Sequence, residues 1–232
     1  MSPSPRGILL DIEGTTTSIA FVHDVLFPHA RARLDAACAR ASSDPRLAEA
    51  VATLREEHEK EPGAELPAFG SGAPYARHLM ESDRKSTGLK LLQGLIWEEG
   101  YRTGALRGHV FVDVPEALAR WRRSGVRLRV FSSGSVLAQK LLFGHTEHGD
   151  LTVHFEGFHD TTTGAKRDAG AYAKIAGAFG LPPAEIAFLS DTVAELDAAA
   201  AAGMRTALMI RPGNAPADPG PHPSHRTFAE LP

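Results

Sequence analysis

Short runs of aliphatic residues that end in polar side chains recur along the chain. The first run covers residues 7–11 and ends at Asp11, and similar runs cover 126–131, 186–189 and 206–210. Continuous apolar runs of this length are typical of strands that are buried on both faces of a parallel sheet. We therefore predict four buried parallel strands, each with polar residues at its carboxyl end.

Helical patterns lie between the three later runs. We expect helices after Pro115, between Ser135 and Gly144, and over about 168–179. Serine before a helix and glycine after it are common capping residues. Strands that alternate with helices of this length predict right-handed βαβ units with helices on both faces of the sheet. The predicted fold class is α/β, with a Rossmann-like parallel sheet.

Residues 18–108 break this alternation, because they carry helical patterns with almost no strand signal. The stretch 47–60 is strongly helical, and leucines recur at helical spacing from Leu89 onward. We predict a helical domain over 18–108, inserted into an α/β core domain formed by 1–17 and 109–232. The stretch 212–232 is rich in proline and glycine and predicts an irregular surface tail.

Composition narrows the choice of partners. The formal net charge of −3 gives no field that would attract nucleic acid or an anionic membrane, and no run approaches the roughly 20 apolar residues of a membrane helix. The single cysteine, Cys38, excludes an intramolecular disulfide and is expected to be a small buried side chain. We therefore expect a cytoplasmic protein that acts without nucleic acid or membrane.

Carboxylates gather at the predicted ligand-binding edge of the sheet. Ligands of open parallel sheets bind at the carboxyl ends of the strands, which is where Asp11, Glu13 and Asp191 fall. Asp11 and Glu13 are two positions apart, so their side chains point the same way if the strand direction continues. An acidic pocket of this kind fits a hard divalent cation such as Mg²⁺.

Phosphate donors are expected at the same edge. Ser132 and Ser133 follow a predicted strand and precede a helix, and Lys166 supplies a positive charge. Each of these residues also has a structural interpretation: the serines as turn or capping residues, Lys166 as a surface lysine, and Asp191 as the N-cap of the next helix. Metal and phosphate donors together indicate phosphoryl transfer.

The ordered motifs carry a resemblance to a known family. DIEGT, at residues 11–15, resembles the first motif of the haloacid dehalogenase (HAD) superfamily, with glutamate in place of the usual second aspartate. DIEGTTT is followed in order by FVHDVLFP, LQGLIWEEGY, FSSGSVLAQKLLFGH, FLSDTVAELDAA and IRPGNA. Within the superfamily this set resembles the enolase-phosphatases of methionine salvage, also called acireductone synthases, over about residues 8–215.

The resemblance implies roles for the residues at the sheet edge. Asp11 would attack phosphorus and become an aspartyl phosphate, while Glu13 would protonate the leaving oxygen and then deprotonate water. Lys166 would be catalytic as well, because it offsets charge in the transition state. The implied Mg²⁺ ligands are Asp11, Glu13 through its carbonyl, and Asp191, and the implied phosphate ligands are Ser132, Ser133 and Lys166.

The resemblance also implies the reaction. One enzyme would enolise 2,3-diketo-5-methylthiopentyl-1-phosphate and then remove its phosphate, which releases the acireductone 1,2-dihydroxy-3-keto-5-methylthiopentene. The helical insert would be a cap that closes over the substrate tail. A complete site in one chain implies a monomer. The sequence leaves open which of Glu13, Lys166 and the metal polarises the carbonyl during enolisation, and which takes the proton.

Two other functions are considered. A HAD phosphatase for another small phosphorylated metabolite would share the same core motifs. A phosphorylatable signalling module of the receiver type would also gather aspartates, a hydroxyl and a lysine at the edge of a parallel sheet, although the large insert argues against it.

Several further residues near the predicted site are interpreted separately. The segment before Lys166 departs from the family pattern GHFDTxxGxK, because Phe158 and His159 stand in exchanged order. Glu195 and Asp197, in the helix after Asp191, could contact the outer shell of the metal, but a solvated or capping role is favoured for both. His145 and His148 have no third ligand in the sequence and are interpreted as loop residues.

Overall fold

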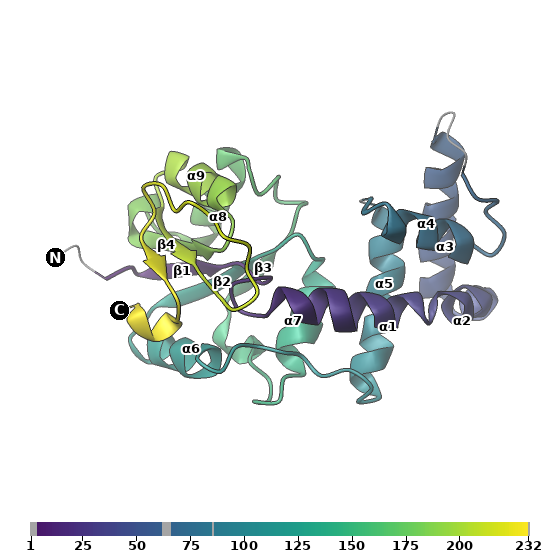
Figure 1. The fold of residues 1–232 in the computed structure, drawn as a ribbon, viewed down its shortest axis with the longest axis horizontal. Coiled ribbons are helices and arrows are strands. Elements are labelled where there is room, and N and C mark those ends of the chain that lie inside the picture. The colour runs from purple at the N-terminus through teal and green to yellow at the C-terminus, as the bar shows by residue number, and fades with distance from the viewer. Residues whose placement is uncertain (1–3, 62–65, 85, 232) are drawn as a thin grey trace. The chain divides into compact units, whose positions relative to one another are not determined.

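The computed structural model describes residues 4–61, 66–84 and 86–231. Contacts within the chain divide it into two compact units (Figure 1). One consists of Met1–Val22 and Arg107–Pro232, and the other of His23–Leu106. Residues 18–22, 107 and 108 thus group with the α/β unit.

The described residues of the first unit form one sheet of six parallel strands in the order β3-β2-β1-β4-β5-β6. The strands are β1 (Gly7–Leu10), β2 (Arg127–Phe131), β3 (Gly157–His159), β4 (Ile186–Ser190), β5 (Arg205–Met209) and β6 (Ser224–His225). The α/β fold and the four predicted strands are confirmed. The prediction of an irregular tail was wrong at β6, because a two-residue strand is too short to carry a hydrophobic period.

The strand order reverses at β1, which lies between β2 and β4. Leu10 is paired with Val130 on one side and with Leu189 on the other. The backbone amide of Asp11 then donates to the carbonyl oxygen of Leu189 at 3.0 Å. The ends of three neighbouring strands therefore meet at the point where parallel α/β sheets bind their ligands.

Helices cover both faces of this sheet. They are α6 (Val114–Arg123), α7 (Val136–Gly144), α8 (Ala169–Phe179) and α9 (Val193–Ala201). The N-cap of α7 is Ser135, whose hydroxyl accepts from the Ala138 amide at 3.2 Å, and Gly180 ends α8 in the left-handed conformation. Figure 1 shows α8 and α9 on one side of the sheet and α6 on the other. The predicted helices are confirmed, and so are the caps at Ser135 and Gly180; Gly144 is instead the last residue of α7, whose C-cap is His145.

The face under α8 and α9 holds a continuous apolar core. Its largest side chains are completely or almost completely buried: Leu9, Phe131, Tyr172, Ile175, Phe179, Phe188 and Leu196. Burial of each such side chain contributes about 1.5–3 kcal/mol. This core fixes β1, β2 and β4 against α8, the helix that follows the predicted catalytic lysine.

The regular secondary structure among the described residues of the second unit is entirely helical. A π-helix (Phe21–Leu26) leads into α1 (Phe27–Arg31), α2 (Leu34–Ala39), α3 (Pro45–Lys60), α4 (Ala73–Glu81) and α5 (Thr87–Arg102). Helices α3 and α5 approach so closely that a Cβ on Gly88 would lie 2.6 Å from the backbone nitrogen of Leu54. Cys38 is buried in this unit, as expected.

None of the helices in the described ranges is both long enough and apolar enough to cross a membrane.

Candidate active site

Asp11 lies directly beyond β1, and only 4% of its surface is exposed. The turn that follows is closed by local hydrogen bonds, since the Thr16 hydroxyl donates to the carbonyl oxygens of Asp11 and Ile12, both at 3.2 Å. Gly14 adopts the left-handed conformation, with φ of +69°. The order of residues in DIEGTTT thus places a carboxylate at the sheet edge and a tight, hydroxyl-braced turn behind it.

Lys166 reaches the same point from the loop between β3 and α8. Its ammonium donates to Asp11 Oδ1 at 2.6 Å, and the side chains of both residues are buried. The hydroxyl of Tyr172, on α8, donates to the Lys166 carbonyl oxygen at 2.7 Å and fixes the lysine backbone. The alternative interpretation of Lys166 as a surface lysine is therefore wrong. Lys174 is exposed, and its ammonium donates to the Thr163 carbonyl oxygen.

Glu195 joins this cluster from the first turn of α9. Its Oε2 lies 2.6 Å from Lys166 Nζ. The Ser190 hydroxyl lies 3.1 Å from Glu195 Oε2 and 3.4 Å from Asp11 Oδ2. This one hydroxyl therefore bridges the two carboxylates as a hydrogen-bond donor. The interpretation of Glu195 as a solvated or capping residue was wrong. Asp197, by contrast, is exposed and bonds to His222.

Asp191 follows β4 and lies over the Gly14 turn. A Cβ placed on Gly14 would clash with Asp191 Oδ2. The Thr192 hydroxyl donates to Asp191 Oδ1 at 3.0 Å, and Thr192 itself is the N-cap residue of α9. Asp191 is therefore not the N-cap that the alternative interpretation required.

Burial and like charge shift the pKa values in the cluster. Burial, followed by the charge of Asp11, raises the pKa of Asp191 to about 6, and Glu13 adds to the shift. The same two causes raise the pKa of Glu195 to about 7. Burial disfavours the charged form of Lys166, but the carboxylates of Asp11 and Glu195 outweigh it and raise the lysine pKa. The site holds more negative than positive charge, which favours a cationic ligand.

Ser132 and Ser133 lie beyond β2, the neighbour of β1. Ser132 is buried and its hydroxyl accepts from the Gly134 amide at 3.2 Å, whereas Ser133 is exposed. Gln139, on α7, donates to the carbonyl oxygens of Gly134 and His159, both at 2.8 Å. The loop that carries the two serines is thereby tied to β3, a role for Gln139 that the sequence did not reveal.

The exchanged pair Phe158 and His159 occupies opposite faces of β3. Phe158 packs against Phe155, with 5.4 Å between ring centroids. His159 Nε2 lies 3.3 Å from Arg129 Nη1, and burial, together with the Arg129 charge, lowers the histidine pKa. Lys166 lies at the cluster even though Phe158 and His159 stand in exchanged order.

The side chains that face one another around Asp11 fit a hard cation. Among the described residues, no group of three or more His, Cys, Asp or Glu side chains could hold a metal ion. The predicted set needs only two side chains, Asp11 and Asp191, together with the carbonyl of Glu13. All three donors are oxygens, which Mg²⁺ prefers, and the charge of Asp11, which adds to burial in raising the pKa of Asp191, is one that a cation would offset.

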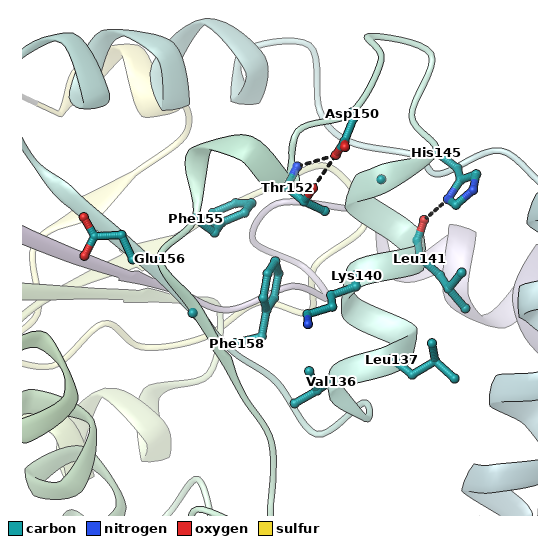
Figure 2. Close-up of a pocket in the computed structure, with 12 residues that line it drawn as sticks. Val136, Leu137, Lys140, Leu141, His145, Asp150, Thr152, Phe155, Glu156 and Phe158 are labelled. Carbon is teal, nitrogen blue, oxygen red and sulfur yellow. Dashed lines mark hydrogen bonds between the residues drawn. The ribbon is translucent and has the colours of Figure 1, made fainter.

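A pocket of about 770 Å³ lies away from this cluster, between α7 and β3 (Figure 2). It is lined by Val136, Leu137, Lys140, Leu141, Gly144, His145, Asp150, Thr152, Phe155, Glu156, Gly157 and Phe158. None of the predicted site residues is among them.

Comparison with known proteins agrees with this geometry. The family model for haloacid dehalogenase-like hydrolases matches residues 5–203. The buried Asp11 and its partner Lys166 therefore lie within the part of the chain that matches this hydrolase family. The chain belongs to the haloacid dehalogenase-like hydrolases.

Full-length relatives narrow the family. Enolase-phosphatase E1 of Sorangium cellulosum is 54% identical, with 90% of each chain covered, and that of Synechococcus elongatus is 48% identical, with 97% of this chain and 96% of the relative covered. The UTR4 protein of Saccharomyces cerevisiae has a crystal structure that matches with a TM-score of 0.81 and 32% identity, over 98% of this chain and 100% of that one. The chain belongs to the Enolase-phosphatase E1 family.

Proposed function

We propose that this chain is the enolase-phosphatase of methionine salvage, which converts 2,3-diketo-5-methylthiopentyl-1-phosphate to the acireductone and phosphate. Membership in the Enolase-phosphatase E1 family supports the substrate. The observation that carries the mechanism is the buried contact of 2.6 Å between Lys166 Nζ and Asp11 Oδ1. It orients a carboxylate and neutralises part of its charge at the end of the central strand.

The first half of phosphate transfer would use Asp11 and Glu13. A carboxylate oxygen of Asp11 attacks phosphorus, and the bond between phosphorus and the ester oxygen breaks. Glu13 donates a proton to that leaving oxygen, so the acireductone departs as a neutral enol. Lys166, Ser132 and Ser133 bind the phosphoryl oxygens and offset the charge that develops on them.

The second half would return the enzyme to its starting state. Glu13, now deprotonated, takes a proton from water as the water oxygen attacks the aspartyl phosphate. The bond between phosphorus and the Asp11 oxygen breaks, and phosphate leaves. Glu195 and Ser190 keep Lys166 and Asp11 in place through both halves, since each contacts the lysine or the aspartate directly.

Asp11, Asp191 and the carbonyl of Glu13 would hold Mg²⁺. When bound, the ion supplies positive charge against the phosphoryl oxygens and the carboxylates. We propose that the helical unit, His23–Leu106, is a cap that excludes water from the reaction.

The alternatives receive less support. Relatives of full length that are named as enzymes favour a hydrolase over a receiver-like signalling module. A phosphatase for a different metabolite has no observation in its favour. That the protein is a monomer and is located in the cytoplasm stays a prediction, which light scattering and cell fractionation would test.

The test incubates purified protein and Mg²⁺ with the diketone phosphate, and follows the ultraviolet absorbance of the enol together with released phosphate. We expect both signals from the wild type, and no phosphate from Asp11→Asn. Glu13→Gln should slow phosphate release in a single turnover. Phosphate release from other esters with no enol signal would discard the substrate and retain the phosphatase.

A matched pair of lysine variants tests the role of the contact between Lys166 and Asp11. Lys166→Met should abolish phosphate release, because it removes the ammonium next to Asp11. Lys174→Met changes an exposed lysine of the following helix and should leave turnover unchanged. Equal activity of the two variants would refute the role of Lys166.

A further inference from the structure

The segment after β5, written IRPGNA, has no part in the mechanism described so far. The side-chain nitrogen of Asn214 donates to the carbonyl oxygen of Gly14 at 2.9 Å and to that of Met209 at 3.1 Å. Because both partners are acceptors, only the NH₂ group of the amide can face them. Asn214 therefore ties the turn behind the proposed nucleophile to the end of β5.

The orientation of Asn214 also directs its oxygen into the site. Oδ1 is buried, and it has no hydrogen-bond partner among the described residues. It lies 3.1 Å from the position of a Cβ on Gly14, a position that the Asp191 carboxylate also approaches. The amide thus braces the turn on one side and presents an oxygen toward Asp191 on the other.

Arg211 holds the next carbonyl of the same turn. Its Nε donates to the Thr15 carbonyl oxygen at 3.0 Å, and its Nη1 donates to Asp113 Oδ2 at 2.8 Å. The guanidinium carbon lies 4.7 Å from the ring centroid of Phe111 and 4.5 Å from that of Phe228. Only 4% of Arg211 is exposed, so the arginine is a rigid anchor.

Two consecutive peptide groups are therefore held by one distant segment. The carbonyl oxygens of Gly14 and Thr15 follow Glu13 directly in the chain, and Gly14 is in the left-handed conformation that few other residues adopt. Rotation of either peptide group would change the direction of the Glu13 backbone and side chain. The turn that carries the proposed acid and base is thus fixed by hydrogen bonds from outside it.

We propose that Asn214 and Arg211 are positioning residues, which act by holding Glu13 in the orientation needed for proton transfer. This inference rests on the proposed function, since it requires that Glu13 act on the leaving oxygen and on water. Neither residue touches the substrate in this role. A displacement of about 1 Å in a catalytic group can reduce the rate about 100-fold, so the effect of losing the brace should be large.

The test compares two variants of Asn214. Asn214→Ala removes the amide, and Asn214→Leu keeps its branched shape while removing both donors. We expect kcat to fall about 10-fold to 100-fold in each, with KM changed less than about 3-fold. Inhibition by vanadate, which mimics the transition state, should weaken by a similar factor, whereas inhibition by inorganic phosphate should not change.

Controls separate positioning from stability. Asp218→Asn alters an exposed residue of the same segment and keeps its bond to the Gly220 amide, so it should behave as wild type. Circular dichroism and the thermal midpoint give the folded fraction of each variant. A normal kcat in folded Asn214→Leu would overturn the inference, and so would a loss of activity that only follows the loss of folded protein.

Asp11→Asn, assayed in parallel, distinguishes the two proposals. If Asp11→Asn is inactive and Asn214→Leu has normal kinetics, the positioning role alone fails. Turnover by Asp11→Asn would refute the mechanism and the positioning role together.

Discussion

The Lys166 ammonium lies 2.6 Å from the Glu195 carboxylate; the lysine side chain is buried, and that of the glutamate is 13% exposed. The lysine comes from a loop and the glutamate from α9, so the contact joins two segments on opposite sides of α8 in the chain. Because Lys166 also contacts Asp11 at 2.6 Å, its position between two carboxylates depends on both of them.

Replacement of Glu195 by Gln should lower kcat. The variant keeps the shape of the side chain and removes one of the two charges that hold Lys166, so we expect a loss of about tenfold or more, equivalent to about 1.4 kcal/mol or more. Steady-state phosphate release measures it. Glu185→Gln is the control, because Glu185 pairs with Arg6 at the surface, where ion pairs contribute little. Unchanged kcat in Glu195→Gln would show that Asp11 alone places the lysine.

Tyr172→Phe should destabilise the protein and reduce turnover modestly. The change removes the hydroxyl that donates to the Lys166 carbonyl oxygen and leaves that oxygen, in a buried residue, without this donor. Loss of one partner of a buried hydrogen bond costs about 1–3 kcal/mol. Urea unfolding measures the free-energy change, and a variant as stable as the wild type would contradict the prediction.

The stability of the metal-free protein should fall as pH rises through the range set by Asp191 and Glu195. Their pKa values are raised to about 6 and about 7 in the folded state, from 3.8 and 4.5. The folded state therefore binds protons more tightly than the unfolded state, so both groups lose stabilising free energy as pH rises from about 4 to about 7. Urea unfolding in a chelator, over this pH range, measures it.

Two companion measurements identify the groups responsible. Asp191→Asn should flatten the dependence on pH, because it removes one of the two titrating groups. Added Mg²⁺ should stabilise the wild type more at high pH than at low pH, since protons compete with the ion for the carboxylates. The same stabilisation by Mg²⁺ at both ends of the range would contradict the assignment of Asp191 as a ligand of the ion.

Gly14→Ala should inactivate the enzyme. The added methyl group would clash with Asp191 Oδ2, in addition to the strain of a left-handed alanine. Gly125→Ala is the control, because Gly125 has φ of +77° and nothing within 4 Å of a Cβ. Phosphate release and the affinity for Mg²⁺ should both fall in the first variant only. Equal effects of the two changes would mean that backbone strain, and not the clash, is responsible.

Local sequence patterns were sufficient to predict the central strands and the polar residues at their ends. β1 and β4 are largely apolar, β2 and β5 end in apolar residues, and each of the four ends within about one residue of the predicted boundary. β3 and β6 were not predicted, because they contain three and two residues, too few to show a hydrophobic pattern. Their positions depend on pairing with β2 and β5, which a local sequence does not reveal.

The contacts of Glu195, Asn214, Arg211 and Lys166 differ in how far the sequence could indicate them. Glu195 stands four positions after Asp191, in the first turn of α9; the sequence allowed it a place in the outer shell of the metal but did not indicate its contact with Lys166. Asn214 and Arg211 stabilise a turn about 200 residues away in the chain, and nothing local to them indicates that contact. Burial of Lys166 was equally invisible, because its partners arrive from β1 and α9.

The central place of β1 has a consequence for the order of folding during synthesis. β1 is made first, yet both of its partners, β2 and β4, are made much later, after the whole helical unit. The helical unit contains its own core and makes contacts between neighbouring helices, which form quickly because little chain entropy is lost. The N-terminal strand must therefore remain unpaired on the ribosome until β2, which ends at Phe131, has emerged, and its other edge stays open until β4 has emerged. An apolar segment is thus exposed to chaperones while the whole helical unit is being made.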